Sequence, residues 1–265
     1  MRNTNLQLRT RPPYSLASYF SLCSPCPPWI NVWLLLRVAL AAALADAGAH
    51  VVLASRTADE VEAAAEEIRA TGARATAAIL DVGDAAGVAA FFDGEEPFDI
   101  LVNNAGTNRP KPMQMVEPND YDAVMGLNVR SAFFVSQACV RQMIDGGVRG
   151  VLIHIGSQMG HVGGPNRSLY CASKWALEGM SKAFALDLAP FGIRSNTIAP
   201  TFIETPMTKP FFGDAAFRAD VLDRIKLGRL GTVEDLMGAV VYLASDAAAL
   251  VTGTSLIVDG GWTAD

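Results

Sequence analysis

From Val38 onward, apolar residues alternate between helical spacing and short continuous runs. Leu40, Leu44 and several alanines lead to Gly48, a typical stop after a helix, and His50–Ala54 is then an apolar run of strand length. Further expected helices run from a cap at Thr57 to about Ala70, after Pro118 and around Tyr170–Leu188, and further expected strands are Ala75–Leu80, Phe98–Val102, Val151–Ile155, Ser195–Ala199 and Ser255–Val258.

This regular alternation over 265 residues fits a single α/β domain. Parallel strands require crossover connections, and helices in those connections cover both faces of the sheet. The pattern therefore predicts a doubly wound, Rossmann-type parallel sheet. Ligands of such sheets bind beyond the carboxyl ends of the strands, so residues that directly follow a strand are the first candidates for a site.

The first 37 residues differ in composition from the rest of the chain. They include four arginines and five prolines but no acidic residue, because the first acidic side chain is Asp46. We therefore expect residues 1–37 to be an atypical segment, by hypothesis a misassigned or frame-shifted start, and residues 38–265 to form the domain. The apolar run Trp29–Leu36 ends at Arg37 and is far shorter than the roughly 20 residues of a membrane helix, so no membrane anchor is expected.

Charge and cysteine content exclude several function classes. The chain has 27 acidic and 21 basic residues and no basic run that could follow a phosphate backbone, so nucleic acid is not an expected partner. Four scattered cysteines do not make a disulfide framework, which favours a reducing, cytoplasmic location. Cys23 and Cys26 are spaced like half of a zinc or redox site, but no second ligand pair follows. No metal is expected.

Polar or small residues follow two of the predicted strands and suggest a dinucleotide site. Ser55 and Arg56 come after Ala54, where the adenosine ribose lies in this architecture. A carboxylate there favours NAD, whereas a hydroxyl and a guanidinium suit a 2′-phosphate, so NADP(H) is favoured over NAD(H). The alternative is a solvated arginine at a strand end. Asn103 to Gly106 form a turn that lets a flat ring approach the backbone, although such turns also occur without a ligand.

Three side chains that can exchange a proton with a carbonyl oxygen follow one another at regular spacing. Ser157 follows a predicted strand, Tyr170 comes thirteen residues later, and Lys174 lies one helical turn beyond. A nearby ammonium group favours the phenolate, so we expect Lys174 to lower the pKa of Tyr170 from about 10. Ser157 is expected to donate to the same carbonyl oxygen. Many exposed helices carry such a Tyr–Lys pair, and only its combination with Ser157, the Asn103 turn and Asn128 indicates catalysis.

From about Val38 to its C-terminus the chain closely resembles the short-chain dehydrogenase/reductase family, in motif content and in order. The matching pieces are Asn103-Asn104-Ala105-Gly106, Asn128-Val129 with Phe133, Ser157, Tyr170-Cys171-Ala172-Ser173-Lys174, Ile193-Arg194-Ser195-Asn196, Pro200 with Thr205, and Val258-Asp259-Gly260-Gly261. Within the family it is similar to gluconate 5-dehydrogenase-like members. The resemblance implies hydride transfer between a nicotinamide cofactor and the carbon of a secondary alcohol or ketone.

The resemblance also assigns roles to individual residues. It implies Tyr170 as acid/base, Lys174 as its pKa modifier and a ribose ligand, Ser157 as the residue that orients the substrate, and Asn128 as a helix-bend residue that holds a proton-relay water. It assigns Asp81 and Val82 to the adenine, and Ile203 and Thr205 to the carboxamide. The full expected cofactor set is Ser55, Arg56, Asp81, Val82, Asn103, Ala105, Gly106, Tyr170, Lys174, Pro200, Ile203 and Thr205.

The family's glycine-rich loop, Thr-Gly-x-x-x-Gly-x-Gly, is missing. Counting back from Arg37 places it on Trp29–Leu36, which contains none of the three glycines. These glycines let the backbone approach the pyrophosphate at a helix N-terminus, so we expect cofactor affinity to fall severely. The family's first strand, at the centre of the sheet, would fall on Leu22–Pro28, where three prolines cannot serve a central ladder. Ile30–Leu36 is the alternative candidate for that strand.

Three functions stay open. The first is an oxidoreductase that interconverts a secondary alcohol and a ketone, on a sugar acid or polyol. The second is a 3-ketoacyl reductase, and the third is a catalytically silent protein that keeps the fold without the phosphate loop. Substrate choice is expected to come from Thr201–Arg229 and Gly160–Arg167, where His161, Asn166, Arg167 and Lys209 suit a hydroxylated or carboxylated small molecule. By resemblance we expect a homotetramer built through the Tyr170 helix, the helix before it and Ser255–Val258.

Overall fold

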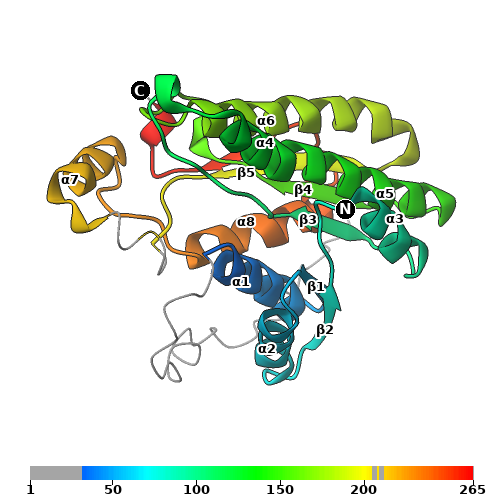
Figure 1. The fold of residues 1–265 in the computed structure, drawn as a ribbon. Helices are drawn as coiled ribbons and strands as arrows, with labels where there is room; N and C mark the ends of the chain where they lie inside the picture. The colour runs from blue at the N-terminus through cyan, green and yellow to red at the C-terminus, as the bar shows by residue number, and fades with distance from the viewer. Residues whose placement is uncertain (1–31, 205–207, 209–211, 265) are drawn as a thin grey trace, which may run out of the picture. The chain divides into compact units, whose positions relative to one another are not determined.

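The computed structural model describes residues 32–204, 208 and 212–264, in which helices and strands alternate (Figure 1). In chain order the elements are α1 (Val32–Asp46), β1 (His50–Ser55), α2 (Ala58–Arg69), β2 (Arg74–Ile79), α3 (Ala85–Asp93), β3 (Ile100–Asn103), α4 (Pro118–Met125), α5 (Ala132–Asp145), β4 (Val151–Ile155), α6 (Ser168–Leu188), β5 (Arg194–Pro200), α7 (Ala215–Arg224), α8 (Glu234–Ala244) and β6 (Ser255–Val258). Every pairing between these strands is parallel, which confirms the predicted α/β class.

The strands form two sheets. β1 pairs with β2, and β3, β4, β5 and β6 form the second sheet in that order. In a doubly wound sheet of order 3-2-1-4-5-6, the first strand lies between the second and the fourth. β1 and β3 take the places of those two neighbours, so within the described ranges the position of the first strand is open.

The prediction that Ile30–Leu36 could supply this strand is wrong from Val32 onward, because Val32–Leu36 begin α1. The physical reason is the long run of leucines and alanines that follows, which has high helix propensity and contains no glycine or proline before Gly48. The other candidate, Leu22–Pro28, lies outside the described residues.

Helices cover both faces of the four-stranded sheet (Figure 1). On one face α5 contacts β3 and α6 contacts β5, and on the other α8 contacts β4 and β5. Leu152 of β4 is fully buried in a cluster with Val88, Cys139 and Met143. His154 of β4 is also fully buried, and burial lowers its pKa to about 4. The interpretation of His154 as a core histidine agrees with this position.

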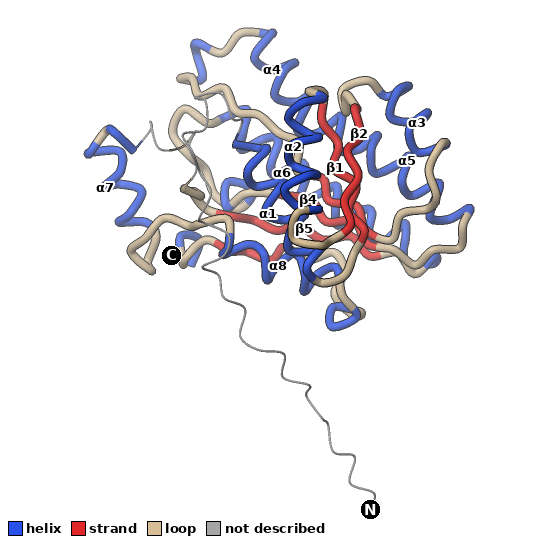
Figure 2. The backbone as a smooth tube through the Cα atoms, turned by 90° about the horizontal axis from the view of Figure 1, so that it is seen from below, coloured by secondary structure: helices blue, strands red, loops and turns tan. Residues whose placement is uncertain are grey.

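Helix packing connects the two sheets. α1 contacts β1 and α2 on one side and α8 on the other, and in both views it lies between α2 and α8 (Figures 1 and 2). The β1–β2 pair is covered by α2, whose apolar side buries Val61, Ala64, Ala65 and Ile68. Among the described residues, the β1–β2 pair is therefore connected to the four-stranded sheet by helix packing through α1 and not by strand pairing.

The helical run Pro118–Asp145 is, among the described residues, the one stretch that is long and apolar enough to cross a membrane by length and composition. Its apolar side chains have another explanation. Val124, Cys139 and Met143 are fully buried inside the domain, as expected of a core helix.

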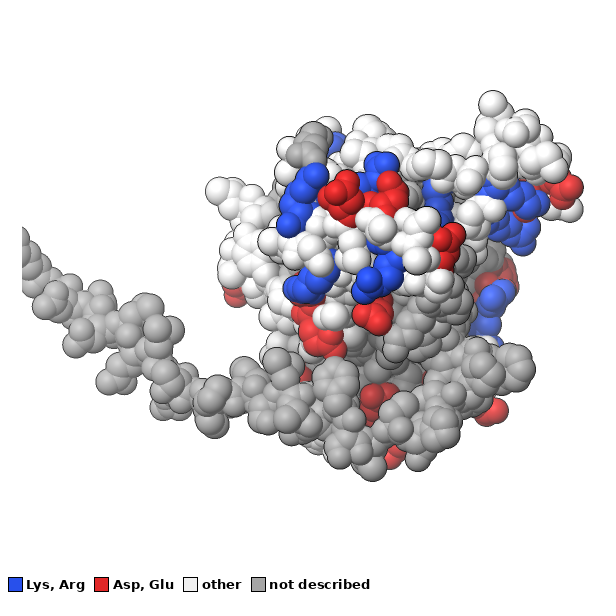
Figure 3. Space-filling model, turned by 90° about the vertical axis from the view of Figure 1, so that its left-hand side faces the viewer, with Lys and Arg blue, Asp and Glu red and all other residues white. Residues whose placement is uncertain are grey.

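Charged side chains of both signs lie next to one another on the face seen in Figure 3. Surface pairs include Arg224 with Asp220 at 3.2 Å and Arg229 with Asp235 at 2.7 Å. Exposed pairs of this kind contribute little to stability. Their alternation means that this face presents no extended field of one sign.

Candidate active site

A cavity of about 240 Å³ lies at the edge where the carboxyl ends of β4 and β5 meet. Gly156 and Gln158 come from the turn after β4, Tyr170 from the first turn of α6, and Pro200 and Ile203 from the end of β5 and the loop behind it. This is the place at which ligands of doubly wound sheets bind. The predicted location of the site and the observed cavity therefore coincide.

Ser157, Tyr170 and Lys174 come together beside this cavity. Tyr170 and Lys174 lie one turn apart on α6, and the Lys174 Nζ is 5.5 Å from the centroid of the Tyr170 ring. The Lys174 ammonium donates a hydrogen bond of 2.7 Å to the carbonyl oxygen of Ile155. Ser157 is hydrogen-bonded to Tyr170 and also donates to Gln158 Oε1 at 2.7 Å. The three side chains face one shared region.

The electrostatics of Tyr170 differ from the prediction. Burial raises the pKa of Tyr170 above its ordinary value, and the Ser157 hydrogen bond and the charge of Arg167 oppose this rise only in part. The Lys174 ammonium is directed to the Ile155 carbonyl. Burial lowers the pKa of Lys174 itself to about 8, against a raising effect from Glu178. The expectation of a Tyr170 pKa below its ordinary value is therefore corrected: desolvation dominates.

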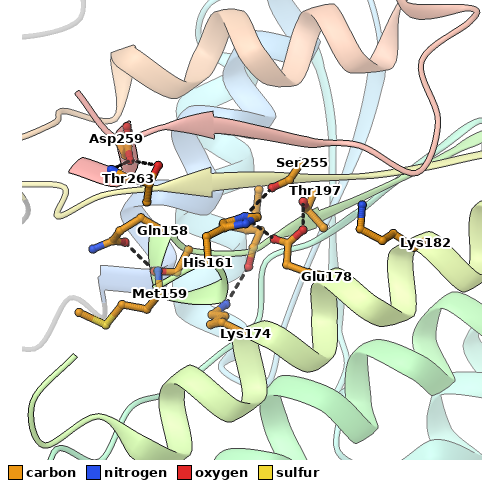
Figure 4. A network of polar contacts seen from close by, with 12 residues as sticks. Gln158, Met159, His161, Lys174, Glu178, Lys182, Thr197, Ser255, Asp259 and Thr263 are labelled. Carbon is orange, nitrogen blue, oxygen red and sulfur yellow. Dashed lines mark hydrogen bonds and ion pairs between the residues drawn. The ribbon is translucent and has the colours of Figure 1, made fainter. Parts of the chain in front are cut away.

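A buried carboxylate lies behind Lys174, and the sequence reasoning missed it (Figure 4). Glu178 follows Lys174 by one helical turn, accepts a hydrogen bond of 2.7 Å from Thr197 Oγ1, and lies 3.5 Å from His161 Nε2. His161 Nε2 is in turn 2.9 Å from Ser255 Oγ. A Cβ at Gly156 would lie 2.8 Å from Glu178 Oε1, so a larger residue there would displace the carboxylate. The available signal was the spacing of Tyr170, Lys174 and Glu178 on one helix face.

Asn128 connects the turn after β3 to α6. It lies in a π-helical segment, Gly126–Ser131, between α4 and α5, where the helix widens and redirects its side chains. Asn128 Oδ1 accepts from the Thr107 amide at 2.7 Å, and Nδ2 donates to the Thr107 carbonyl and to Ser173 Oγ, both at 2.9 Å. Ser173 Oγ donates to the Tyr170 carbonyl at 2.8 Å. Asn128 thus supports the helix turn that carries Tyr170.

The predicted adenosine-side residues lie after β1 and β2. Arg56 is exposed directly after β1, and Ser55 Oγ accepts a hydrogen bond of 3.4 Å from the Thr57 amide. Thr57 occupies the position before α2, but its own side chain makes no capping hydrogen bond. Asp81 Oδ1 accepts from the Gly83 amide at 2.9 Å, and Val82 packs against the core cluster of α3 and α5.

The predicted nicotinamide-side residues divide into two groups. Pro200 and Ile203 line the cavity, whereas Thr205 lies outside the described residues. The Asn103 side chain turns inward, with Nδ2 2.8 Å from Ser136 Oγ and 3.2 Å from His154 Nδ1. Only the backbone of Asn103, Ala105 and Gly106 is then left for a ligand on this turn.

A dinucleotide fits the two ends of this edge but not its middle. The exposed Arg56 suits the ribose end, and the cavity beside Tyr170 and Ile203 suits a flat ring. Between them, α1 begins at Val32 without a glycine in its first turns, and the buried Leu36 side chain forms part of the cavity wall. A glycine-rich helix N-terminus, which receives diphosphate through its free amides, has no counterpart among the described residues.

Comparison with known proteins agrees with this geometry. The profile of the family described as enoyl-(acyl carrier protein) reductase matches residues 38–263. A gluconate 5-dehydrogenase from Gluconobacter oxydans is 39% identical over 228 residues, which is 84% of this chain and 89% of that protein. An L-xylulose reductase from Bos taurus is 35% identical over 222 residues, again 84% and 89%. A solved gluconate 5-dehydrogenase from Burkholderia cenocepacia, in complex with NADP and tartrate, has a TM-score of 0.84 and 38% identity over 87% of this chain and 91% of that chain.

Proposed function

Because the chain belongs to the short-chain dehydrogenase/reductase family of NAD(P)-dependent enzymes, we propose that it interconverts a secondary alcohol and a ketone on a sugar acid or polyol, with NADP(H) as cofactor. The observation that carries the proposal is that Ser157 and Lys174 lie next to Tyr170, which lines the cavity. Relatives named for gluconate and xylulose support the substrate class.

Tyr170 acts as the proton donor and acceptor in this proposal. Because burial raises its pKa, the phenol is protonated at neutral pH and ready to give its proton to a carbonyl oxygen. Ser157, next to Tyr170, orients that oxygen by a second hydrogen bond. The charged form of Lys174 stabilises the phenolate that remains. The cofactor, when bound, supplies or accepts the hydride.

NADP(H) is favoured over NAD(H) because Arg56 is exposed after β1 and can hold a 2′-phosphate. The solved relative with bound NADP supports the same choice.

We also propose that the protein is a cytoplasmic homotetramer, in which residues 38–265 form the domain and residues 1–37 are an atypical start. Exposed Phe133 on α5 and Trp175 on α6 support an interface on these helices. Light scattering of the wild type and Trp175→Glu tests it, since a lasting monomer in both would contradict the tetramer.

The missing glycine loop keeps the catalytically silent protein as the second candidate. Titration of NADPH into the purified full chain, followed by nucleotide fluorescence, separates the two. Saturable micromolar binding, together with NADPH oxidation by L-xylulose or NADP⁺ reduction by D-gluconate, supports the enzyme. No binding up to millimolar NADPH supports the silent protein. Tyr170→Phe is the control, because it should keep nucleotide binding and lose turnover.

A further inference from the structure

Arg167 is the single charged side chain among the described residues that line the cavity. It directly precedes α6 and comes three residues before Tyr170, and both residues line the cavity. The guanidinium is close enough to Tyr170 for its charge to act on the phenol.

Among the described residues this guanidinium has no acidic partner. They form no ion pair or side-chain hydrogen bond with it, and Asp265 is the one acidic residue outside them. Arg109 and Lys111, in the neighbouring loop, both form ion pairs with Asp120, at 3.3 Å and 2.6 Å. Arg167 is half-buried, and burial lowers its pKa. A buried charge without a counter-ion is costly, so an anion that enters the cavity is stabilised there.

We propose that Arg167 binds the carboxylate of a hydroxy acid, so that this site takes aldonates in preference to neutral polyols of the same length. The planar guanidinium matches a carboxylate in a two-point hydrogen bond, and no other cation of the described lining offers this. Gln158 and Thr107 line the same cavity and provide polar contacts for the hydroxyl groups. The inference rests on the proposed function, because the hydroxy acid that Arg167 would bind is the proposed substrate.

The first test compares kcat/KM for D-gluconate and for D-glucitol, its neutral counterpart, with NADP⁺ and the full chain. Arg167→Gln should lower the value for gluconate on the order of 10- to 100-fold more than that for glucitol, mainly through KM, because a change in the ionisation of Tyr170 acts on both substrates alike. Arg167→Lys should fall between the two, because lysine keeps the charge without the planar fork. Arg74→Gln, at an exposed site on β2, is the charge-matched control. Equal losses on both substrates, or no loss on gluconate, overturn the inference.

Calorimetric titration of the same two probes keeps the inference separate from the proposed function. If gluconate binds the wild-type chain and Arg167→Gln weakens its affinity, the result supports carboxylate binding by Arg167. This holds even if the chain turns over neither substrate, and then only the proposed function fails. Gluconate that does not bind the wild type, or that binds the variant equally well, overturns the role of Arg167. Glucitol binding should be the same in both proteins.

Discussion

Glu178→Gln isolates the effect of the buried carboxylate on Lys174. The substitution keeps the shape of the side chain and an oxygen that can accept from Thr197 Oγ1, removes the charge, and replaces the second oxygen by an NH2 group. Glu178 raises the pKa of Lys174, which burial holds at about 8. Without the carboxylate, desolvation acts on the ammonium unopposed, and the pKa of Lys174 should fall further.

The size of the fall follows from the spacing on α6. Side chains one turn apart are ~6 Å from each other, and at an effective dielectric constant of ~20 to ~40 their interaction is ~1.4 to ~2.8 kcal/mol, or about one to two pKa units. At pH 7.5 a lysine with a pKa of about 8 is about three quarters charged. A fall of one unit leaves about one quarter charged. The variant should therefore have a mostly neutral Lys174 at a pH where the wild type is mostly charged.

Carbon NMR of protein labelled at lysine Cε measures this directly, because the chain has only five lysines and Lys174→Arg identifies the signal. The measurement does not require bound cofactor or turnover. Asp187→Asn is the matched control, since it removes one acidic charge from an exposed position on the same helix, about 20 Å along the axis from Lys174. The reasoning is refuted if Glu178→Gln leaves the Lys174 titration in place or raises it, or if Asp187→Asn moves it equally.

Three further predictions concern stability. Asn128→Ala removes the partners of both Thr107 backbone groups and of Ser173, and should lower the free energy of unfolding in urea by roughly 2 to 4 kcal/mol; a change below the error of the urea midpoint would contradict it. Leu152→Ala opens a cavity in the fully buried β4 and should cost about 3 to 5 kcal/mol in the same assay, against a small effect for exposed Leu250→Ala. Hydrogen bonds from Lys111, which has the larger effect, and from the Glu117 amide lower the pKa of Asp120 to about 2. This carboxylate therefore contributes stability above about pH 4 that is lost as the pH falls towards 2. Melting temperatures of Asp120→Asn should lack that part of the acid decline, and parallel curves for both proteins would exclude it.

The strands could be predicted well because they are apolar runs between clear turn residues. Val151–Ile155 and Ser255–Val258 agree with β4 and β6 at both ends. The start of α1 could not be predicted, because a short apolar run such as Val32–Leu36 is compatible with a buried strand and with a buried helix. Only the alanines that follow it favour the helix. The family pattern favoured a strand at this position, because it places a central strand before the first helix.

The members of the site could be predicted from the sequence, but not their environment. Tyr170 and Lys174 were found by spacing, whereas the direction of the Tyr170 pKa depends on burial, which spacing does not encode. Glu178 was missed because a glutamate one turn after a lysine is ordinarily a solvated surface pair. Asn103 was assigned to the cofactor from its motif, but its amide bonds Ser136 in the interior.

The residues proposed for proton transfer and for cofactor binding belong to two different sheets. Strand pairing and hydrogen bonds position the first group, and helix packing positions the second. The proton-transfer groups depend on β4, β5 and α6, which are joined by strand pairing and by the hydrogen bonds from Lys174 to Ile155 and from Thr197 to Glu178. Arg56 depends on the β1–β2 pair, which reaches the rest of the domain through α1 packing. Among the described residues no strand joins β1 to β3, and Arg56 and the acid/base groups belong to different sheets. A displacement of the β1–β2 pair should therefore appear as weak cofactor binding and not as a changed ionisation of Tyr170 or Lys174.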